Sequence, residues 1–293
     1  MSSFPLNALP LGLRAYRFAW RIRSLLRRAR GTFCGVVASG LLVAAAHAHD
    51  AWLLPSSTVL SQAEWITVDA AVSNDLFFFN HAPLKLDGLE VTAPDGSTLA
   101  PQNIERGKLR SVFDLELKDP GTYRLAVHNN ALFATYTDGT GKPRRWRGTP
   151  DKLASGALPT DARDVVVTQL QGLVETYVTV GKPTVPRPGG SGLEMVALTH
   201  PNDLVGGEAA TFMLQIDGQV AAGLKVQIIA GNSRYRDDAG AQEVITDERG
   251  RFSFTWPHAG MYWLSASARD GKATVPQAAE RRLSYAVTLE VLP

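Results

Sequence analysis

The sequence predicts an all-β protein made of two β-sandwich units that follow a cleavable N-terminal signal helix. Three observations support this prediction. Most segments after residue 48 alternate apolar and polar residues with period two. Gly, Pro, Asn and Asp separate these segments at short intervals, which is typical of turns between strands. The first 48 residues instead have a basic front and an apolar stretch.

Residues 1–48 have the order of a secretory leader, with basic, apolar and then small residues. Seven arginines and no acidic residue come before Asp50. The apolar stretch 36–46 is shorter than the roughly 20 residues that span a bilayer. We therefore expect an exported, periplasmic protein that does not itself span the membrane once cleaved. Cleavage after Ala46 and cleavage after Ala48 both satisfy the small-residue rule, and the sequence does not choose between them.

Removal of the leader reverses the charge of the protein. The whole chain has 30 Lys and Arg against 28 Asp and Glu, and seven of the basic residues lie in the leader. The remaining 23 basic and 28 acidic residues give a net charge of −5, which argues against a nucleic-acid partner. The lone cysteine, Cys34, also lies in the leader, so no disulfide is expected and the fold must depend on its apolar core.

The first unit is predicted over residues 49–181. Its expected strands cover residues 65–72, 89–93, 112–117, 123–128, 132–136 and 165–180. His128, directly before Asn129 and Asn130, is predicted to end a hairpin. Residues 150–163 alternate poorly and are the one place where a short helix is expected.

A stretch rich in Pro and Gly, residues 182–192, is predicted to be a linker. The second unit, residues 193–293, has the length and strand spacing of an immunoglobulin-like sandwich. Its expected strands cover residues 211–216, 225–230, 251–254, 262–266 and 283–291.

This second unit resembles carboxypeptidase-regulatory or transthyretin-like sandwiches. The resemblance is carried by a turn glycine, a Thr-Asp pair, Gly-x-Phe and Gly-x-Tyr, here Gly223, Thr246-Asp247, Gly250-Arg251-Phe252 and Gly260-Met261-Tyr262. The resemblance implies a fold and no chemistry.

The chain from about His47 to Pro293 also resembles the domain-of-unknown-function family 4198. The motifs that carry this resemblance are His47 to Leu53, Pro94-Asp95-Gly96, Pro120 to Tyr123, Glu175-Thr176, Val180 to Pro183, Leu193-Glu194 and Tyr285 to Leu289. Members of that family are often labelled periplasmic components of nickel or cobalt uptake. The resemblance therefore implies transition-metal handling, with a membrane metal transporter or an outer-membrane receptor as partner.

The mature N-terminus is the leading candidate for a metal site. A chain beginning His47-Ala48-His49 offers an amine, two backbone amides and an imidazole, which suit the square-planar geometry of Cu(II) or Ni(II). A chain beginning at His49 offers only the amine and one ring, so Asp50 and other ligands must complete the set. The alternative is that both histidines are junction residues in a frayed end.

His81 is the expected contribution of the folded body to the metal site. It follows Asn74-Asp75 and three consecutive phenylalanines, residues 77–79, and imidazole beside carboxylate suits divalent metals. The residue pattern favours a second interpretation, in which the phenylalanines pack in the core and His81 lies in a turn. His128, His200 and His258 are expected to be structural.

Glu175 and Glu194 flank the predicted linker, and they either bridge the two units by hydrogen bonds or complete a ligand set. The sequence lacks nucleophile-elbow, zinc-protease, Walker and dinucleotide motifs, so we expect a non-catalytic protein with no catalytic residues. The first hypothesis is binding of nickel, cobalt or copper for uptake or delivery. The rival is an adhesion or carbohydrate-binding sandwich that uses exposed Trp146, Trp256 and Tyr136.

Overall fold

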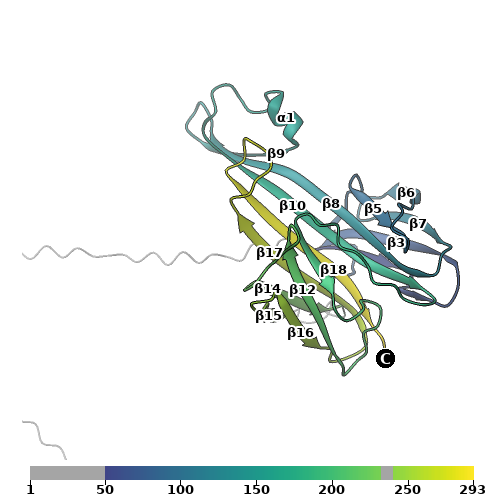
Figure 1. Cartoon of the computed structure of the whole chain (residues 1–293). Helices are drawn as coiled ribbons and strands as arrows, with labels where there is room; N and C mark the ends of the chain where they lie inside the picture. Colours follow the sequence, from purple (N-terminus) through teal and green to yellow (C-terminus); the bar gives the residue numbers. More distant parts are fainter. Residues whose placement is uncertain (1–49, 232–239) are drawn as a thin grey trace, which may run out of the picture. The chain divides into compact units, whose positions relative to one another are not determined.

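The computed structural model describes residues 50–231 and 240–293, and these are almost entirely β. The predicted signal helix lies outside the described residues. The strands are β1 (Asp50–Pro55), β2 (Val59–Leu60), β3 (Glu64–Ser73), β4 (Ala82–Pro83), β5 (Leu89–Thr92), β6 (Gln102–Arg106), β7 (Ser111–Leu117), β8 (Gly121–Thr137), β9 (Pro143–Gly148), β10 (Arg163–Val180), β11 (Leu193–Ala197), β12 (Ala209–Ile216), β13 (Gln219–Val220), β14 (Lys225–Ala230), β15 (Gln242–Ile245), β16 (Arg251–Thr255), β17 (Gly260–Asp270) and β18 (Glu280–Val291). One short helix, α1 (Pro150–Ala154), lies near the far ends of β8 and β10 (Figure 1). Within the described residues, no helix has the length and apolar character needed to cross a membrane.

A nine-stranded sheet forms the centre of the fold. Its order is β15-β14-β17-β18-β10-β8-β5, with β2 beside β10 and β9 beside β8. The pairing of β10 with β18 is parallel, from Thr168 opposite Glu280 to Thr176 opposite Thr288. Strands from both sides of residues 182–192 therefore share one sheet. The division into units 49–181 and 193–293 stays a prediction about how the chain is organised.

Each face of the central sheet is covered by a smaller sheet. Val174 on β10 and Ala286 on β18 point toward the five-stranded sheet of β1, β3, β4, β6 and β7, where they pack with Trp52. Leu173 and Tyr285, the adjacent residues in sequence, point toward the four-stranded sheet of β11, β12, β13 and β16. Because successive side chains of a strand point to opposite faces of the sheet, a central strand is buried on both faces wherever both smaller sheets lie against it.

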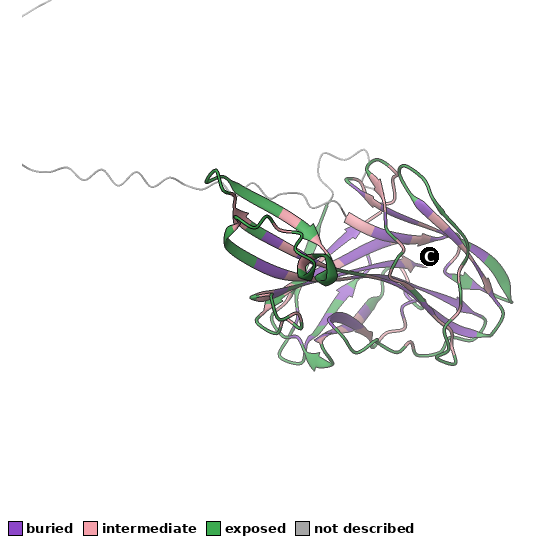
Figure 2. Ribbon diagram, turned by 90° about the horizontal axis from the view of Figure 1, so that it is seen from above, coloured by how far each residue is buried: buried purple, intermediate pink, exposed green. Residues whose placement is uncertain are grey.

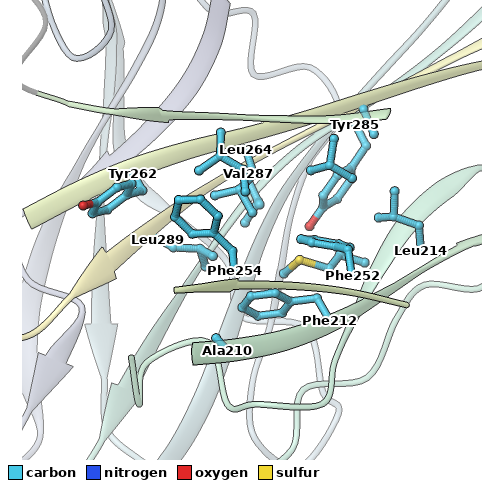
Figure 3. Packing of buried hydrophobic residues seen from close by; sticks show 14 of the residues in the cluster. Ala210, Phe212, Leu214, Phe252, Phe254, Tyr262, Leu264, Tyr285, Val287 and Leu289 are labelled. Atoms are coloured by element: carbon cyan, nitrogen blue, oxygen red, sulfur yellow. The ribbon is translucent and has the colours of Figure 1, made fainter. Parts of the chain in front are cut away.

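The core against the four-stranded sheet is rich in aromatic residues. Phe212, Phe252 and Phe254 turn toward Leu264 and other apolar residues of the central sheet (Figure 3). Buried residues lie along the strands, and exposed residues gather in the connecting loops (Figure 2). In the C-terminal half, the alternating apolar residues therefore lie on one face of each strand and pack into this core, as expected for a sandwich.

The predicted hairpin at His128 is wrong. Residues 128–130 lie inside β8, a strand of 17 residues that runs without a turn. Here Asn129 pairs with Gly172 and Asn130 with Gln171 on β10. The two asparagines are exposed side chains on a paired strand, and the tendency of Asn to form turns is overridden by the continuous ladder.

The predicted linker, residues 182–192, forms no strand but is tied to the body by hydrogen bonds. The Thr184 hydroxyl accepts from the Thr122 backbone N–H at 2.9 Å, and the Thr184 N–H donates to the Thr122 hydroxyl at 3.1 Å. At the other end, the Gly192 N–H donates to the carboxylate of Asp217 at 2.9 Å. This stretch is therefore held at both ends rather than free.

Arg281 on β18 joins the turn between β12 and β13 to the central sheet. Its guanidinium lies 2.7 Å from the carboxylates of both Asp217 and Asp270. Only 3% of the Arg281 side chain is exposed. Hydrogen bonds from Arg281 are the main cause of the lowered pKa of each aspartate. The two carboxylates therefore stay charged to lower pH in the folded protein than in the unfolded chain.

We expect this triad to make stability depend on pH in acid. Because the pKa of each aspartate is lower when folded, its contribution is complete above the ordinary value of 3.8 and is lost as the pH falls through the folded pKa. The free energy of unfolding of Asp217→Asn and Asp270→Asn should therefore fall less steeply than wild type between about pH 5 and about pH 2. Urea unfolding at each pH measures this, with exposed Asp87→Asn as control. Parallel curves for all four proteins would contradict the prediction.

Candidate functional site

The structure brings two of the predicted metal ligands to one end of the five-stranded sheet. Asp50 is the first residue of β1 and pairs with Ser73 on β3. On the other side of β3, Val72 pairs with Ala82 of β4, the residue that follows His81. His81 itself lies in the bend before β4. Asp50 and His81 thus belong to segments on the two sides of β3, near the same end of the sheet.

The start of β1 is firmly anchored at this end of the sheet. Trp52 is fully buried, and its indole N–H donates to the Ser73 hydroxyl at 2.7 Å. The indole N–H of Trp263, on the central sheet, donates to the carbonyl of Ala51 at 3.0 Å. The residue that follows His49 in the chain is therefore held in a fixed place.

The loop before His81 is folded around aromatic packing. The rings of Phe77 and Phe79 lie 5.4 and 5.5 Å from the Trp52 ring, centroid to centroid. Phe77 has a positive φ of 64°, a strained conformation for a large side chain. The Asn80 side chain closes the loop by donating to the Asp75 carboxylate at 2.6 Å. The phenylalanines therefore pack as the core interpretation expects.

The set of metal ligands expected from the sequence stays a prediction. His47 and His49 lie outside the described residues. His81 is exposed in a bend, and Asp75 already accepts from Asn80. In residues 50–231 and 240–293, no three His, Cys, Asp or Glu side chains gather closely enough to hold a metal ion.

The other histidines have different surroundings. The His200 ring Nε2 lies 2.9 Å from the Thr122 hydroxyl and 3.0 Å from the Thr184 carbonyl, so His200 helps to hold the 182–192 stretch. His128 lies 3.6 Å from the carboxylate of Glu90 on the neighbouring strand. His258 is exposed in the turn before β17.

The aromatic residues of the rival hypothesis are not arranged as an exposed platform. Trp256 is fully buried, so the expectation that it is exposed is wrong. It packs edge-on against Tyr262 at 4.9 Å between ring centroids. Trp146 and Tyr136 are half-buried, and the Trp146 ring lies over Gly148.

A charged cluster is buried between the central sheet and the four-stranded sheet. Glu175 accepts from Arg124 Nε at 2.7 Å and from the hydroxyls of Tyr177 and Tyr285 at 2.6 and 2.5 Å. Glu194 on β11 lies 3.5 Å from Arg124 Nη2. Arg124 is 5% exposed, and both glutamates are 1% exposed. One buried guanidinium thus serves two buried carboxylates.

Backbone groups complete the cluster. Gly189 and Gly190 donate their N–H groups to Glu194 at 2.6 and 2.7 Å. Burial is the largest single influence and lowers the pKa of Arg124, but Glu175, Tyr177 and Glu194 together outweigh it, so this pKa is raised. Burial, with the Glu175 charge, raises the pKa of Tyr177 well above its usual value, so that hydroxyl remains a donor. Glu175 therefore joins the two predicted units by its hydrogen bond with Tyr285, in line with the first of the two interpretations open from sequence. Glu194 is instead hydrogen-bonded to the 182–192 stretch and faces Arg124 across the layers as an ion pair.

Sequence reasoning did not identify Arg124, Arg281 or the Thr122 network. Arg124 sits in the run 121–127, where every residue of β8 is buried. A charged residue in a strand that is otherwise buried on both sides is the signal that indicates a paired charge. Its partner, Glu175, was identified, but no pattern in the sequence joins residues 51 positions apart.

Comparison with known proteins identifies one family. The family model described as "Domain of unknown function (DUF4198)" matches residues 46–270. No curated protein matches the sequence.

Several solved structures are similar to the chain. The D0-D1 domain of intimin is 12% identical, with 82% of this chain and 97% of that chain covered and a TM-score of 0.21. A two-domain fibronectin type-III segment from chicken tenascin is 12% identical, with 83% and 99% covered and a TM-score of 0.21. A fibronectin(III)-like module structure of Clostridium thermocellum CbhA is 11% identical, with 82% and 94% covered and a TM-score of 0.19. Because these TM-scores are so low, the likenesses say nothing about a ligand of this chain.

The buried cluster generates a stability prediction. Arg124→Met leaves two buried carboxylates without a cation, so the free energy of unfolding should fall by roughly 3–5 kcal/mol. Adding Glu175→Gln to that variant should recover part of the loss, because one uncompensated charge is removed. Urea unfolding measures both effects. Lys225→Met, which breaks an exposed ion pair with Glu243, is the control and should cost less than about 1 kcal/mol. An Arg124→Met loss no larger than this control would contradict the prediction.

Proposed function

Because this chain belongs to the family of the domain of unknown function DUF4198, we propose that it is an exported, non-catalytic protein that binds nickel, cobalt or copper. It assists uptake or delivery of the ion to a membrane transporter or an outer-membrane receptor. The observation that carries the proposal is the run His47-Ala48-His49, placed directly ahead of Asp50, the first residue of an anchored strand. A chelate formed by this run would be held against the body by β1.

The cleavage position decides which ligands take part. A terminus at His47 supplies an amine, two amide nitrogens and the His49 imidazole, which is a complete square-planar set for Ni(II) or Cu(II). A terminus at His49 supplies two nitrogens, and the body must add the rest. In that second case Asp50 and His81, which lie on the two sides of β3 near the same end of the sheet, are the residues that would contribute.

The rival function, a metal-free adhesion or carbohydrate-binding sandwich, depended on exposed aromatic residues. Burial of Trp256 removes one of the two tryptophans that would stack on a sugar.

Blocking the N-terminus tests the terminal chelate. N-terminal sequencing of the exported protein first establishes the mature end. The mature protein and a form with one extra N-terminal residue are then titrated with Ni(II) and Cu(II) by calorimetry. Affinity should fall at least about tenfold in the extended form, because the amine nitrogen is displaced from its place in the chelate. Affinity of the native form should also fall as the pH drops below about 7.7–8.0, because binding must displace the amine proton. Equal affinity of the two forms would overturn the proposal.

His81→Ala separates the two cleavage cases. If the mature chain begins at His49, this change should weaken metal binding, because an imidazole of the incomplete set is lost. If the chain begins at His47, binding should be unchanged. His258→Ala, which removes another exposed histidine, is the matched control for both. Weakened binding in the control as well would show that the metal binds surface histidines without selection.

A further inference from the structure

The far half of the central sheet has one open face. Beyond the five-stranded sheet, the strands β8, β10, β18 and β17 continue, and their exposed side chains border a hollow of about 530 Å³. That volume lies within the range of ligand-binding clefts. The opposite face of the same region is covered, where α1 and the 271–279 loop place Leu153 and Val275 against Leu132. Only one side of this part of the sheet is therefore available to a ligand.

The floor of the hollow is one row of small residues across four strands. Asn129 pairs with Gly172, Gly172 with Ser284, and Ser284 with Ser267. A Cβ on Gly172 would lie 3.0 Å from the Ser284 hydroxyl oxygen, so glycine keeps the middle of the row low. The floor thus offers an amide and two hydroxyls around a shallow centre.

Three arginines border this floor. Arg282 and Arg269 lie directly opposite each other on β18 and β17, an arrangement of like charges that normally destabilises a sheet. Arg147 on the edge strand β9 also lines the hollow. We call these three residues and the floor row the arginine groove.

A single carboxylate offsets part of this charge. Glu280 lies 3.0 Å from Arg282 Nη2 and 3.4 Å from Arg269 Nη1. Glu280 also accepts from the Thr168 hydroxyl at 3.1 Å, which fixes its position. Among the described residues that line the hollow, none is acidic, so the groove keeps an excess of two positive charges. This excess stands out on a chain whose residues after 48 have a net charge of −5.

We propose that the arginine groove binds an acidic oligosaccharide, a chain of hydroxyl-rich sugars that carry carboxylates. Arginine recognises carboxylates through paired N–H donors, and the Asn and Ser side chains of the floor suit sugar hydroxyls. Arg147 and Arg269 are four strand spacings apart, about 19 Å between Cα atoms, so the ligand must span several sugar units.

Other anions fit the groove less well. An acidic peptide that adds a strand needs a free sheet edge, whereas Gly172 and Ser284 lie on interior strands paired on both sides. A flat anionic surface cannot reach the floor of a hollow. Neutral sugars normally require an exposed aromatic ring, and the lining contains none.

Calorimetric titration of the full mature protein tests the proposal. The probe is a hexamer of galacturonate, and a neutral galactose hexamer is the matched sugar. Galacturonate should bind, binding should weaken with salt, and the neutral hexamer should not bind. No binding of galacturonate at millimolar concentration would overturn the proposal. So would equal binding of the neutral hexamer, or equal binding of polyglutamate or polyphosphate.

Two variants locate the site. The double variant Arg269→Gln/Arg282→Gln should bind about tenfold more weakly or worse, because both carboxylate-binding groups of one row are lost. The control Arg249→Gln/Arg251→Gln makes the same charge change at two exposed residues around the start of β16 and should bind normally.

Ser267→Tyr fills the floor without a change of charge and should also abolish binding. Because Ser267 is exposed, this variant should keep the thermal stability of the wild type, which circular dichroism checks. Normal binding by the double variant or by Ser267→Tyr would overturn the assignment to this groove. Metal binding at the N-terminus is measured separately, so failure of either proposal leaves the other open to its own test.

Discussion

The parallel pairing of β10 with β18 is the constraint on which the rest of the structure depends. It places the last strand of the chain in the middle of the nine-stranded sheet, between strands that come from the two halves of the sequence. Because this sheet is buried on both faces over much of its length, both hydrophobic cores are built on the same backbone ladder. A charged group that such a sheet carries inward requires a partner of opposite charge within the protein, and this requirement accounts for the buried ion pairs.

Two arginines meet that requirement in different ways. Arg124 is enclosed with Glu175 and Glu194, and its environment includes tyrosine hydroxyls and backbone N–H groups. Arg281 lies at the margin of the same layer, and its aspartate partners remain partly open to solvent. Both arginines connect the central sheet to residues outside it, so they fix the position of the four-stranded sheet. The cost of burying each charge is offset only because its partners are already held in place.

The all-β class and most strands could be predicted because period-two alternation is a local property of the chain. The strands that begin at residues 225 and 251 illustrate this, since apolar side chains alternate along both. The prediction failed at residues 128–130, where turn-forming residues lie in a strand whose pairing partner is more than 40 positions away. Local sequence propensity carries no information about such a distant pairing partner.

The candidate site could be predicted from the sequence to a similar extent. The aromatic packing around Phe79 follows from local pattern, whereas the strand that begins at Asp50 was not among the expected strands. The placement of Asp50 and His81 near one end of the sheet depends on how β1 and β4 flank β3, which no short motif encodes. The arginine groove was invisible for the same reason, because Arg147, Arg269 and Arg282 meet only through the order of five strands.

The central place of β18 also has a consequence for the order of folding. During synthesis the N-terminal half of the chain is complete long before residues 280–291 exist, so β10 must wait with one edge unpaired. An open edge on a long, apolar strand is prone to pair with other chains. Contacts between residues about 110 positions apart also close slowly, because loop entropy opposes them. A chaperone that covers β10 until the C-terminal strand has been synthesised would therefore protect the chain at the stage of folding when it is most prone to pair with other chains.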